Sequence, residues 1–358
     1  MNKDLILQYL HKADIGEINL MEICGTHTHA IAKAGIKNML PPNIHLLSGP
    51  GCPVCVTPEE EIDAFLELSM RPEIIITTYG DMIRVPGSTP GDNLALRRAK
   101  GADVRVVYSP IDAIDIAKQN PDKEIVFLGV GFETTAPGTA AAIKVASEAG
   151  VKNFSVFSML KLVEPALRAL IADPAFNVQG FIVPGHVAVI LGEDGFKFLA
   201  DEYDIPSVIT GFEPEDIWLS IYKLVKQLED KKLHGAHAKL ENAYTRLVNP
   251  AGNKLAMAMI ANSLEIRDDI WRGLGSIKSS GLGLKKGLED FDAEKKFALN
   301  LELTGRTTAC QCGDIIKGLK SPSSCPLFGK RCTPDDPVGP CMVSGEGACS
   351  AAYKYSML

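Results

Sequence analysis

The sequence lacks several features that would place it in a common class of protein. No stretch approaches the roughly 20 consecutive apolar residues of a membrane helix. The start, MNKDLILQYLHKADIGEINL, has neither a long apolar segment nor a small-residue cleavage site, so we expect a protein of the cytoplasm. Lysine and arginine form no basic cluster, and the net charge is -7. This balance argues against nucleic acid as a main partner, because phosphate contacts need concentrated positive charge.

Nucleotide-binding signatures and mid-chain cysteines are also missing. Neither Gly-x-x-x-x-Gly-Lys-[Ser/Thr] nor Gly-x-Gly-x-x-Gly occurs, so no standard nucleotide site is indicated. The nine cysteines form an early and a late group: Cys24, Cys52 and Cys55, then Cys310, Cys312, Cys325, Cys332, Cys341 and Cys349. In a reducing compartment, this number of thiols favours metal or redox chemistry over a disulfide framework. We therefore expect two separate sulfur sites.

Short apolar runs alternate with helical patterns from about residue 17 to residue 230. The runs are INLMEI, IHLLS, EIIITT, VRVVY, EIVFLGV, FSVFSML, FIVPG and SVIT, and their alternation with helices predicts parallel α/β units. VFLGVGFETTAPG and SVITGFEPEDIW both lead from an apolar run through Gly-Phe-Glu towards a helix. This echo indicates two related lobes.

Beyond about residue 232 the alternation of strands and helices stops. A segment with helical periodicity follows, and then a C-terminal end rich in Gly, Ser, Pro and Cys. The fold class predicted is therefore α/β, with two similar parallel-sheet lobes at residues 16–125 and 126–232. A third domain, mainly helical and irregular, would combine residues 1–15 with 233–358. Because its end has little apolar periodicity, it would need a metal or crosslinks to be ordered.

The late cysteines are widely spaced. Fourteen residues separate Cys310 from Cys325, six separate Cys325 from Cys332, and sixteen separate Cys332 from Cys349. Four thiolates suit either tetrahedral zinc or a 4Fe-4S cluster. The close Cys-x(2 to 4)-Cys knuckles of structural zinc sites are absent, which favours the cluster. Spacing alone leaves open which four of the six cysteines bind, and whether the other two are a redox dithiol or buried free thiols.

The early cysteines stand where strands give way to helices. MEICGTHTHAIAKAGI predicts a strand ending at Cys24 and a helix starting near Thr26, whose positive end would favour a thiolate. GPGCPVC places Cys52 and Cys55 as a Cys-x-x-Cys pair after a strand and before a helix, as in thioredoxin-like redox motifs. If the strands are parallel neighbours, all three thiols open on one crevice. They could hold a soft metal there.

Three further residues are candidates for proton transfer or binding. Glu133, in GFETTAP, would lie at the crevice as a proton carrier or simply as a helix cap. His27 follows Cys24, and His186 follows the run FIVPG. For each histidine the alternative is a structural core residue.

The motifs CGTHTHAI, GPGCPVCVTP and GFETTAPGTA, together with the fourteen, six and sixteen spacing, resemble one family. That family is HypD, maturation factors of nickel-iron hydrogenases, and the resemblance spans the chain. It implies that Cys310, Cys325, Cys332 and Cys349 bind a 4Fe-4S cluster. It also implies that Cys312 and Cys341 are a dithiol/disulfide pair beside the cluster.

The resemblance further implies a scaffold on which, with the small protein HypC, an iron carrying cyanide and CO, Fe(CN)2CO, is assembled. Cyanide would come from HypE, acting with HypF, and the iron group would pass to the hydrogenase large subunit. Cys24 would be the iron ligand from this chain, opposite a HypC cysteine. Cys52 and Cys55 would supply a further sulfur, assigned to Cys55, or a redox pair.

Two rival functions remain open from the sequence. A thiol-disulfide oxidoreductase would cycle Cys52 and Cys55 using electrons from the cluster. A zinc-stabilised binding module would contain zinc and no redox chemistry. Whether a scaffold that acts once per iron counts as an enzyme is left open.

Overall fold

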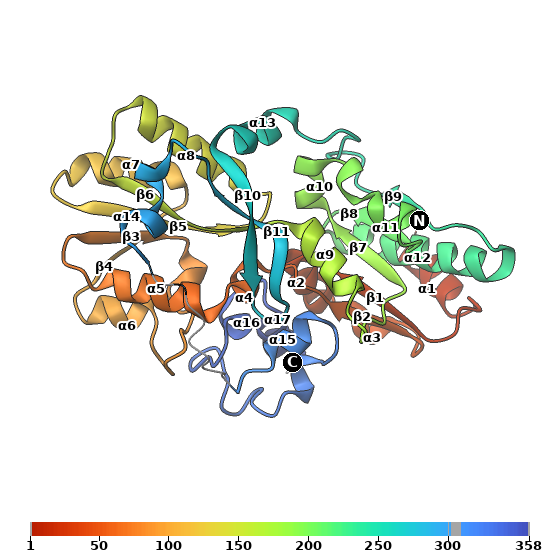
Figure 1. Ribbon diagram of the computed structural model, residues 1–358. Coiled ribbons are helices and arrows are strands. Elements are labelled where there is room, and N and C mark those ends of the chain that lie inside the picture. The colour runs from red at the N-terminus through yellow and green to blue at the C-terminus, as the bar shows by residue number, and fades with distance from the viewer. Residues whose placement is uncertain (1, 300, 302–308, 357–358) are drawn as a thin grey trace.

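The computed structural model describes residues 2–299, 301 and 309–356. Within them, two sheets form the centres of two lobes (Figure 1). The first sheet has five parallel strands in the order β2 (Ile44–Ser48), β1 (Ile18–Glu22), β7 (Gly180–Pro184), β8 (Ser207–Thr210) and β9 (Leu240–Asn242). The predicted α/β class with two parallel-sheet lobes is confirmed.

The second sheet has six strands in the order β10 (Leu264–Trp271), β11 (Gly275–Leu284), β6 (Phe154–Lys161), β5 (Glu124–Gly131), β3 (Ile74–Thr78) and β4 (Asp103–Val106). Strands β3 to β6 are parallel, whereas β11 runs antiparallel to both β6 and β10. All eight predicted strand runs are therefore strands. The expectation that strands end near residue 232 is wrong, since β9, β10 and β11 follow it.

Side chains of the first sheet alternate between two helical layers. Leu20, Ile182 and Val208 pack towards one layer, and Met21 and Phe181 pack towards the other. The first layer contains α1 (Lys3–Leu10), α2 (Gly25–Lys33), α3 (Ile36–Met39) and α12 (Pro214–His234). The second contains α9 (Val163–Ile171), α10 (Gly185–Leu191) and α11 (Phe198–Asp201). The N-terminal helix α1 thus belongs to this lobe, packed on α12, and not to the C-terminal domain expected for residues 1–15.

The second sheet is covered in the same way. Ile125 and Phe127 of β5 face α7 (Pro110–Gln119), α8 (Ala136–Glu148) and α13 (Lys254–Ser263). Val126 and Leu128 face α5 (Glu59–Ser69), α6 (Leu94–Ala99) and the short helices α4 (Pro53–Val56) and α14 (Ala293–Lys296). Because both faces of each sheet are covered, strands such as β5 are almost wholly buried.

Helix α7 begins with a capping box formed by Ser109 and Asp112.

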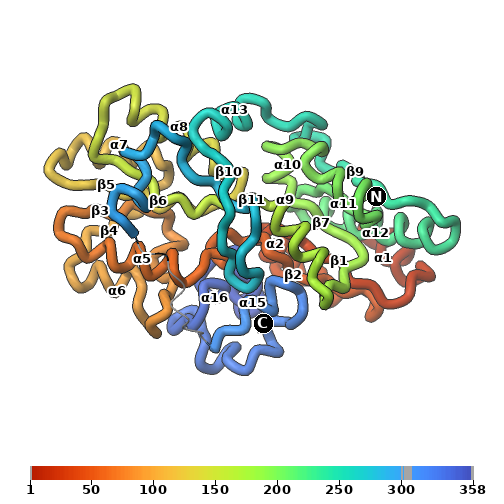
Figure 2. Tube along the Cα trace, viewed as in Figure 1, coloured from red at the N-terminus to blue at the C-terminus, as the bar shows by residue number. Residues whose placement is uncertain are grey.

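The chain alternates between the lobes, as the tube in Figure 2 traces. It forms β1 and β2 in the first sheet, β3 to β6 in the second, β7 to β9 in the first, and β10 and β11 in the second. The predicted ranges 16–125 and 126–232 therefore each supply strands to both sheets. Hydrophobic periodicity identifies strands, but it carries no information about which strands pair.

The C-terminal segment contains α15 (Cys312–Ile316), α16 (Pro340–Val343) and α17 (Ala348–Ser356), joined by irregular chain. Figure 1 shows it in blue between the two lobes, at the lower centre of the view. Its buried residues join the cores of the lobes: Cys312, Cys341 and Met342 join that of the second, and Ile316 joins that of the first. Helix α17 packs on α2, and α16 packs on α4. The segment thus reaches both early cysteine motifs.

Among the residues described above, no helix has the length and apolar character needed to cross a membrane.

Candidate thiol and metal centre

Cys24 lies in the turn between β1 and α2, as the sequence predicts, and is the N-cap residue of α2. Its sulfur accepts hydrogen bonds from the backbone N–H groups of Thr26 and His27. Burial nevertheless raises the pKa of the Cys24 thiol to about 12, and the charge of Glu346 adds to the effect. The expectation that the helix end favours the thiolate is therefore wrong for this structure, because desolvation outweighs two N–H groups.

A buried carboxyl group fixes the turn that carries Cys24. Glu22 Oε2 accepts the backbone N–H of Cys24 at 3.0 Å, and Oε1 accepts the hydroxyl of Thr28. Burial raises the pKa of Glu22 to about 7. The thiol is thus held between the last residue of a strand and the first turn of a helix.

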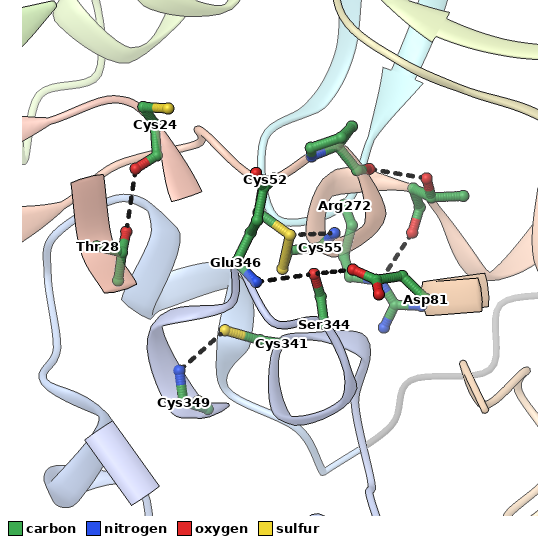
Figure 3. Close-up of a disulfide and its surroundings, with 12 residues drawn as sticks. Cys24, Thr28, Cys52, Cys55, Asp81, Arg272, Cys341, Ser344, Glu346 and Cys349 are labelled. Carbon is green, nitrogen blue, oxygen red and sulfur yellow. Dashed lines mark hydrogen bonds between the residues drawn. A yellow bond between two sulfur atoms is a disulfide. The ribbon is translucent and has the colours of Figure 1, made fainter. Parts of the chain in front are cut away.

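Cys52 and Cys55 form a disulfide, with their Cα atoms 5.2 Å apart (Figure 3). They follow β2, the parallel neighbour of β1, so all three early cysteines stand beyond the carboxyl ends of two adjacent strands. Cys52 is the N-cap residue of α4, and its sulfur accepts the backbone N–H of Cys55 at 3.1 Å. Cys52 is 5% exposed and Cys55 is fully buried.

The two early motifs touch through glycines. Gly25 donates its backbone N–H to the carbonyl of Gly51 at 3.0 Å. A Cβ atom on Gly51 would overlap the backbone of Cys24, and one on Gly25 would overlap Glu346. The glycines of CGT and GPGC are therefore needed for close approach of three backbone segments.

The C-terminal segment contacts the first turns of α2, which follow Cys24. The hydroxyl of Thr26 donates to Glu346 Oε1 at 3.0 Å. Ser344 joins Glu346 to the second lobe, because its hydroxyl accepts the Glu346 N–H and donates to Asp81 Oδ2, both at 3.2 Å. Figure 3 shows Ser344 and Glu346 on the side of the disulfide that faces the C-terminal segment. At the far end, Tyr355 of α17 lies 2.8 Å from the ring of His29 on α2.

The late cysteines pack in the hydrophobic core of the second lobe, together with the Cys52–Cys55 disulfide. Cys312, Cys332, Cys341 and Cys349 are buried in one hydrophobic cluster with Cys52 and Cys55, and Cys310 and Cys325 pack against it. Cys341 Sγ accepts the backbone N–H of Cys349 at 3.2 Å, and the side chains of Cys310 and Cys312 share a hydrogen bond. A Cβ atom on Gly339 would overlap the sulfur of Cys310. Of the early cysteines, Cys52 and Cys55 therefore share one hydrophobic cluster with the late cysteines, so these two are not separated from the late group as expected.

The donor chemistry of this centre suits a soft metal. Across residues 2–299, 301 and 309–356, no three His, Cys, Asp or Glu side chains converge as a ready-made metal site. The available donors, however, are thiols set in an apolar cluster. Sulfur donors select zinc, copper(I) and iron-sulfur clusters over hard cations. The chemistry of the donor set therefore fits the expected 4Fe-4S group.

The two candidate histidines lie together. His27 and His186 both stack on Phe212, with ring centroids 4.6 Å and 3.8 Å from it. His27 Nε2 lies 2.9 Å from the carbonyl oxygen of Gly211, and Nδ1 has no hydrogen-bond partner among the described residues. Burial lowers the pKa of His27 to about 4. His27 is thus a neutral, buried ring packed between α2 and the chain that follows β8.

Glu133 follows β5 and turns towards the start of α9. Its Oε1 accepts the backbone N–H of Val163, the first residue of α9, at 2.9 Å. Burial raises the pKa of Glu133 to about 7, and Oε2 has no hydrogen-bond partner in the described part of the chain. The side chain therefore caps a helix while keeping one carboxyl oxygen free.

Arg272 belongs to the centre but was not anticipated from the sequence. It follows β10 and binds the chain just after Cys55: its backbone N–H donates to Val56 O at 2.8 Å and its Nε to Thr57 O at 3.0 Å. Nη1 lies 2.9 Å from Glu59. The sequence around Arg272 is typical of an exposed turn between two strands, so it does not predict a contact with the chain after Cys55.

A buried lysine was also missed. Lys161 ends the apolar run of β6, and its side chain is 1% exposed. Its Nζ lies 3.4 Å from Glu61 Oε1 and 3.2 Å from Asp269 Oδ2. The sequence could have indicated this buried charge, because Lys161 directly follows FSVFSML in a strand that was expected to be buried.

Comparison with known proteins agrees with the motifs. The family model described as "HypD: Hydrogenase formation hypA family" matches residues 3–356. The chain is 44% identical over 361 residues to hydrogenase maturation factor HypD of Rhizobium leguminosarum bv. viciae, covering 99% of this chain and 92% of that protein. It is 45% identical to HypD of Azotobacter vinelandii (95% and 89% covered) and 43% identical to HypD of Escherichia coli strain K12 (94% and 89% covered).

Proposed function

The chain belongs to the HypD family of hydrogenase maturation factors, and on that premise we propose that it is an assembly scaffold for the iron group of nickel-iron hydrogenase. On it, with HypC, iron would receive its cyanide and CO ligands to become Fe(CN)2CO. One observation carries this proposal: the segment with six cysteines packs on α2, which begins beside Cys24, and on α4, which carries Cys55 of the disulfide.

Cys24 is the proposed ligand of the iron that receives cyanide and CO, and a HypC cysteine would bind the same iron from the opposite side. Soft thiolates suit an iron that carries cyanide and CO. Because the Cys24 thiol is buried and its pKa is raised to about 12, iron binding would require an opening of the structure around it and the loss of its proton. Cys55 is the proposed second sulfur, and it becomes available only after its disulfide with Cys52 is reduced.

Cys310, Cys325, Cys332 and Cys349 would hold a 4Fe-4S cluster, and Cys312 and Cys341 would form the neighbouring dithiol. When bound, the cluster would supply single electrons. Helix α16, which carries Cys341, packs on α4, which carries Cys55. Exchange between the dithiol and the Cys52–Cys55 disulfide would oxidise the first pair as it reduces the second.

The remaining candidates take supporting roles in this proposal. Glu133 is a proton carrier, because one of its oxygens is free and its pKa is near neutrality. His27 and His186, both stacked on Phe212, would support the chain that carries Cys24. The proposed partners are HypC, HypE with HypF as cyanide source, and indirectly the hydrogenase large subunit, all in the cytoplasm.

Anaerobic purification with HypC, followed by infrared spectroscopy and an iron count, tests the proposal. Cyanide and CO stretching bands, with more than four irons per chain, are expected. An empty spectrum with four irons, in material made alongside the other maturation proteins, would contradict it.

The disulfide supports a second candidate function, a cluster-dependent thiol-disulfide oxidoreductase. That function predicts repeated reduction of protein disulfides without HypC. A zinc-only metal content would instead favour a binding module and count against both redox functions.

A further inference from the structure

A cavity lies between helices α2 and α3 of the first lobe and the C-terminal segment. Its volume is about 240 Å³, which is roughly the room that eight water molecules take up. Its walls come from α2, α3, the end of β2, the turn at residues 321–323 and the first turns of α17. The scaffold chemistry proposed above uses none of the side chains that line it.

Lys37 of α3 gives this cavity a positive charge. Among the described residues that line it, Lys37 is the one cation and none is acidic. Its ammonium group makes no hydrogen bond or ion pair within the described part of the chain. Glu22 attracts it from behind the wall, where Thr28 and Ser48 donate their hydroxyls to that carboxyl group. A hollow lined by charge of one sign concentrates ions of the other, so the cavity favours an anion.

Neutral hydrogen-bond donors also line the cavity. The hydroxyl oxygens of Ser321 and Ser323 lie 3.0 Å apart, and only one of the two hydroxyls can donate to the other. The second hydroxyl therefore keeps a proton for a ligand. The side-chain amide of Asn38 likewise has no hydrogen-bond partner among the described residues. An anion beside Lys37 would thus find donors from both sides of the cavity.

The rest of the wall is apolar, and the charge on it is single. Ile31, Phe328 and Ala351 line the cavity together with further alanines of α17. Ligand sites commonly combine such apolar walls with a few polar groups that fix orientation. One lysine balances one negative charge, which a carboxylate carries, whereas a phosphate group carries nearly two at neutral pH. These features suit a monocarboxylate with a short apolar body.

We propose that this cavity is a binding site for a small monocarboxylate. The carboxylate group pairs with Lys37 and accepts the free hydroxyl of the Ser321 and Ser323 pair. The apolar body of the ligand lies against Ile31 and Phe328. Because the walls come from both the first lobe and the C-terminal segment, the bound ligand joins the two. This inference goes beyond the scaffold function and does not rest on it.

The test is a titration of the purified full chain with butyrate at constant ionic strength, followed by saturation-transfer NMR of the ligand. We expect binding to saturate. Acetate lacks two methylene groups and should bind about tenfold more weakly, because it covers less of the apolar wall. Propylammonium, which has the same propyl chain and the opposite charge, should not compete with butyrate. Inorganic phosphate should bind more weakly than butyrate.

Three variants locate the binding. Lys37→Gln should raise the dissociation constant of butyrate at least about tenfold. Lys33→Gln, at an exposed lysine of α2 outside the cavity wall, should bind as wild type. Ala352→Leu keeps the charge but fills the cavity, and it should block binding as well.

Four outcomes would overturn the proposal: no saturable binding of butyrate, an unchanged dissociation constant in Lys37→Gln or Ala352→Leu, competition by propylammonium, or tighter binding of phosphate than of butyrate. If Lys37→Gln does not fold, Ala352→Leu and the two ligand comparisons decide. The titration uses this chain alone, so absence of infrared bands with HypC would defeat the scaffold function without affecting this result.

Discussion

Gly51 lies against the backbone of Cys24, so that any side chain at position 51 would overlap it. Replacing Gly51 by alanine should therefore push the two cysteine motifs apart and destabilise the fold by about 1–3 kcal/mol, as overpacking does. The expected readouts are a lowered free energy of unfolding and loss of iron from protein purified with HypC. Gly138→Ala is the matched control, because its Cβ would make only ordinary contact with Pro110. Equal stability of the two variants would show that the motifs do not need this close approach.

Cys24→Ala should abolish binding of the iron that carries cyanide and CO, while leaving the 4Fe-4S cluster in place. The expected result is an iron count reduced to four per chain, with unchanged cluster absorbance and no cyanide or CO bands. Infrared bands that survive the change would exclude Cys24 as the ligand. Loss of bands and cluster together would indicate a folding defect.

The late cysteines should differ in their effect on the cluster. Cys332→Ala removes a proposed ligand and should leave anaerobically reconstituted protein without four irons. Cys312→Ala removes a proposed redox thiol and should leave the four irons in place, with slower reduction of Cys52–Cys55. Iron and sulfide analysis of the two variants checks the assignment. A reversal, with iron lost only from Cys312→Ala, would require a different set of four.

Acid should destabilise the protein through His27. Its pKa is lowered from 6.5 to about 4 on folding because of burial. Its contribution to stability is therefore present above pH 6.5 and is lost as pH falls towards about 4, by roughly 3 kcal/mol. His27→Gln should flatten this part of the curve of unfolding free energy against pH, whereas the same change at exposed His11 should not. Parallel curves for wild type and His27→Gln would show that other groups cause the acid sensitivity.

The sequence predicted local features of this fold well because they depend on neighbouring residues. Each of the eight apolar runs is a strand, and Cys24 and Cys52 both follow strands and precede helices. The three early thiols stand beyond adjacent parallel strands, β1 and β2. Periodicity and turn residues suffice for such predictions.

Features that depend on distant residues were missed. The helix end that was expected to favour the thiolate is correctly placed, but burial of Cys24 in the folded chain, with a smaller contribution from the charge of Glu346, raises the pKa of its thiol. Likewise, the charges of Lys161 and Asp269 meet because β11 pairs with both β6 and β10 and so brings the two strands into one sheet. Strand pairing is decided by packing of the whole chain, which periodicity does not encode.

The alternation of the chain between the two sheets has a practical consequence. No continuous stretch ending before β9 contains a complete sheet, because β9 completes the first and β10 and β11 complete the second. A truncated gene product ending at residue 125 or 232 would expose unpaired strand edges, which promote aggregation. Moreover, the first passage from one sheet to the other, between β2 and β3, is the segment that contains Cys52 and Cys55. The disulfide therefore closes a small ring within the first covalent connection between the two lobes.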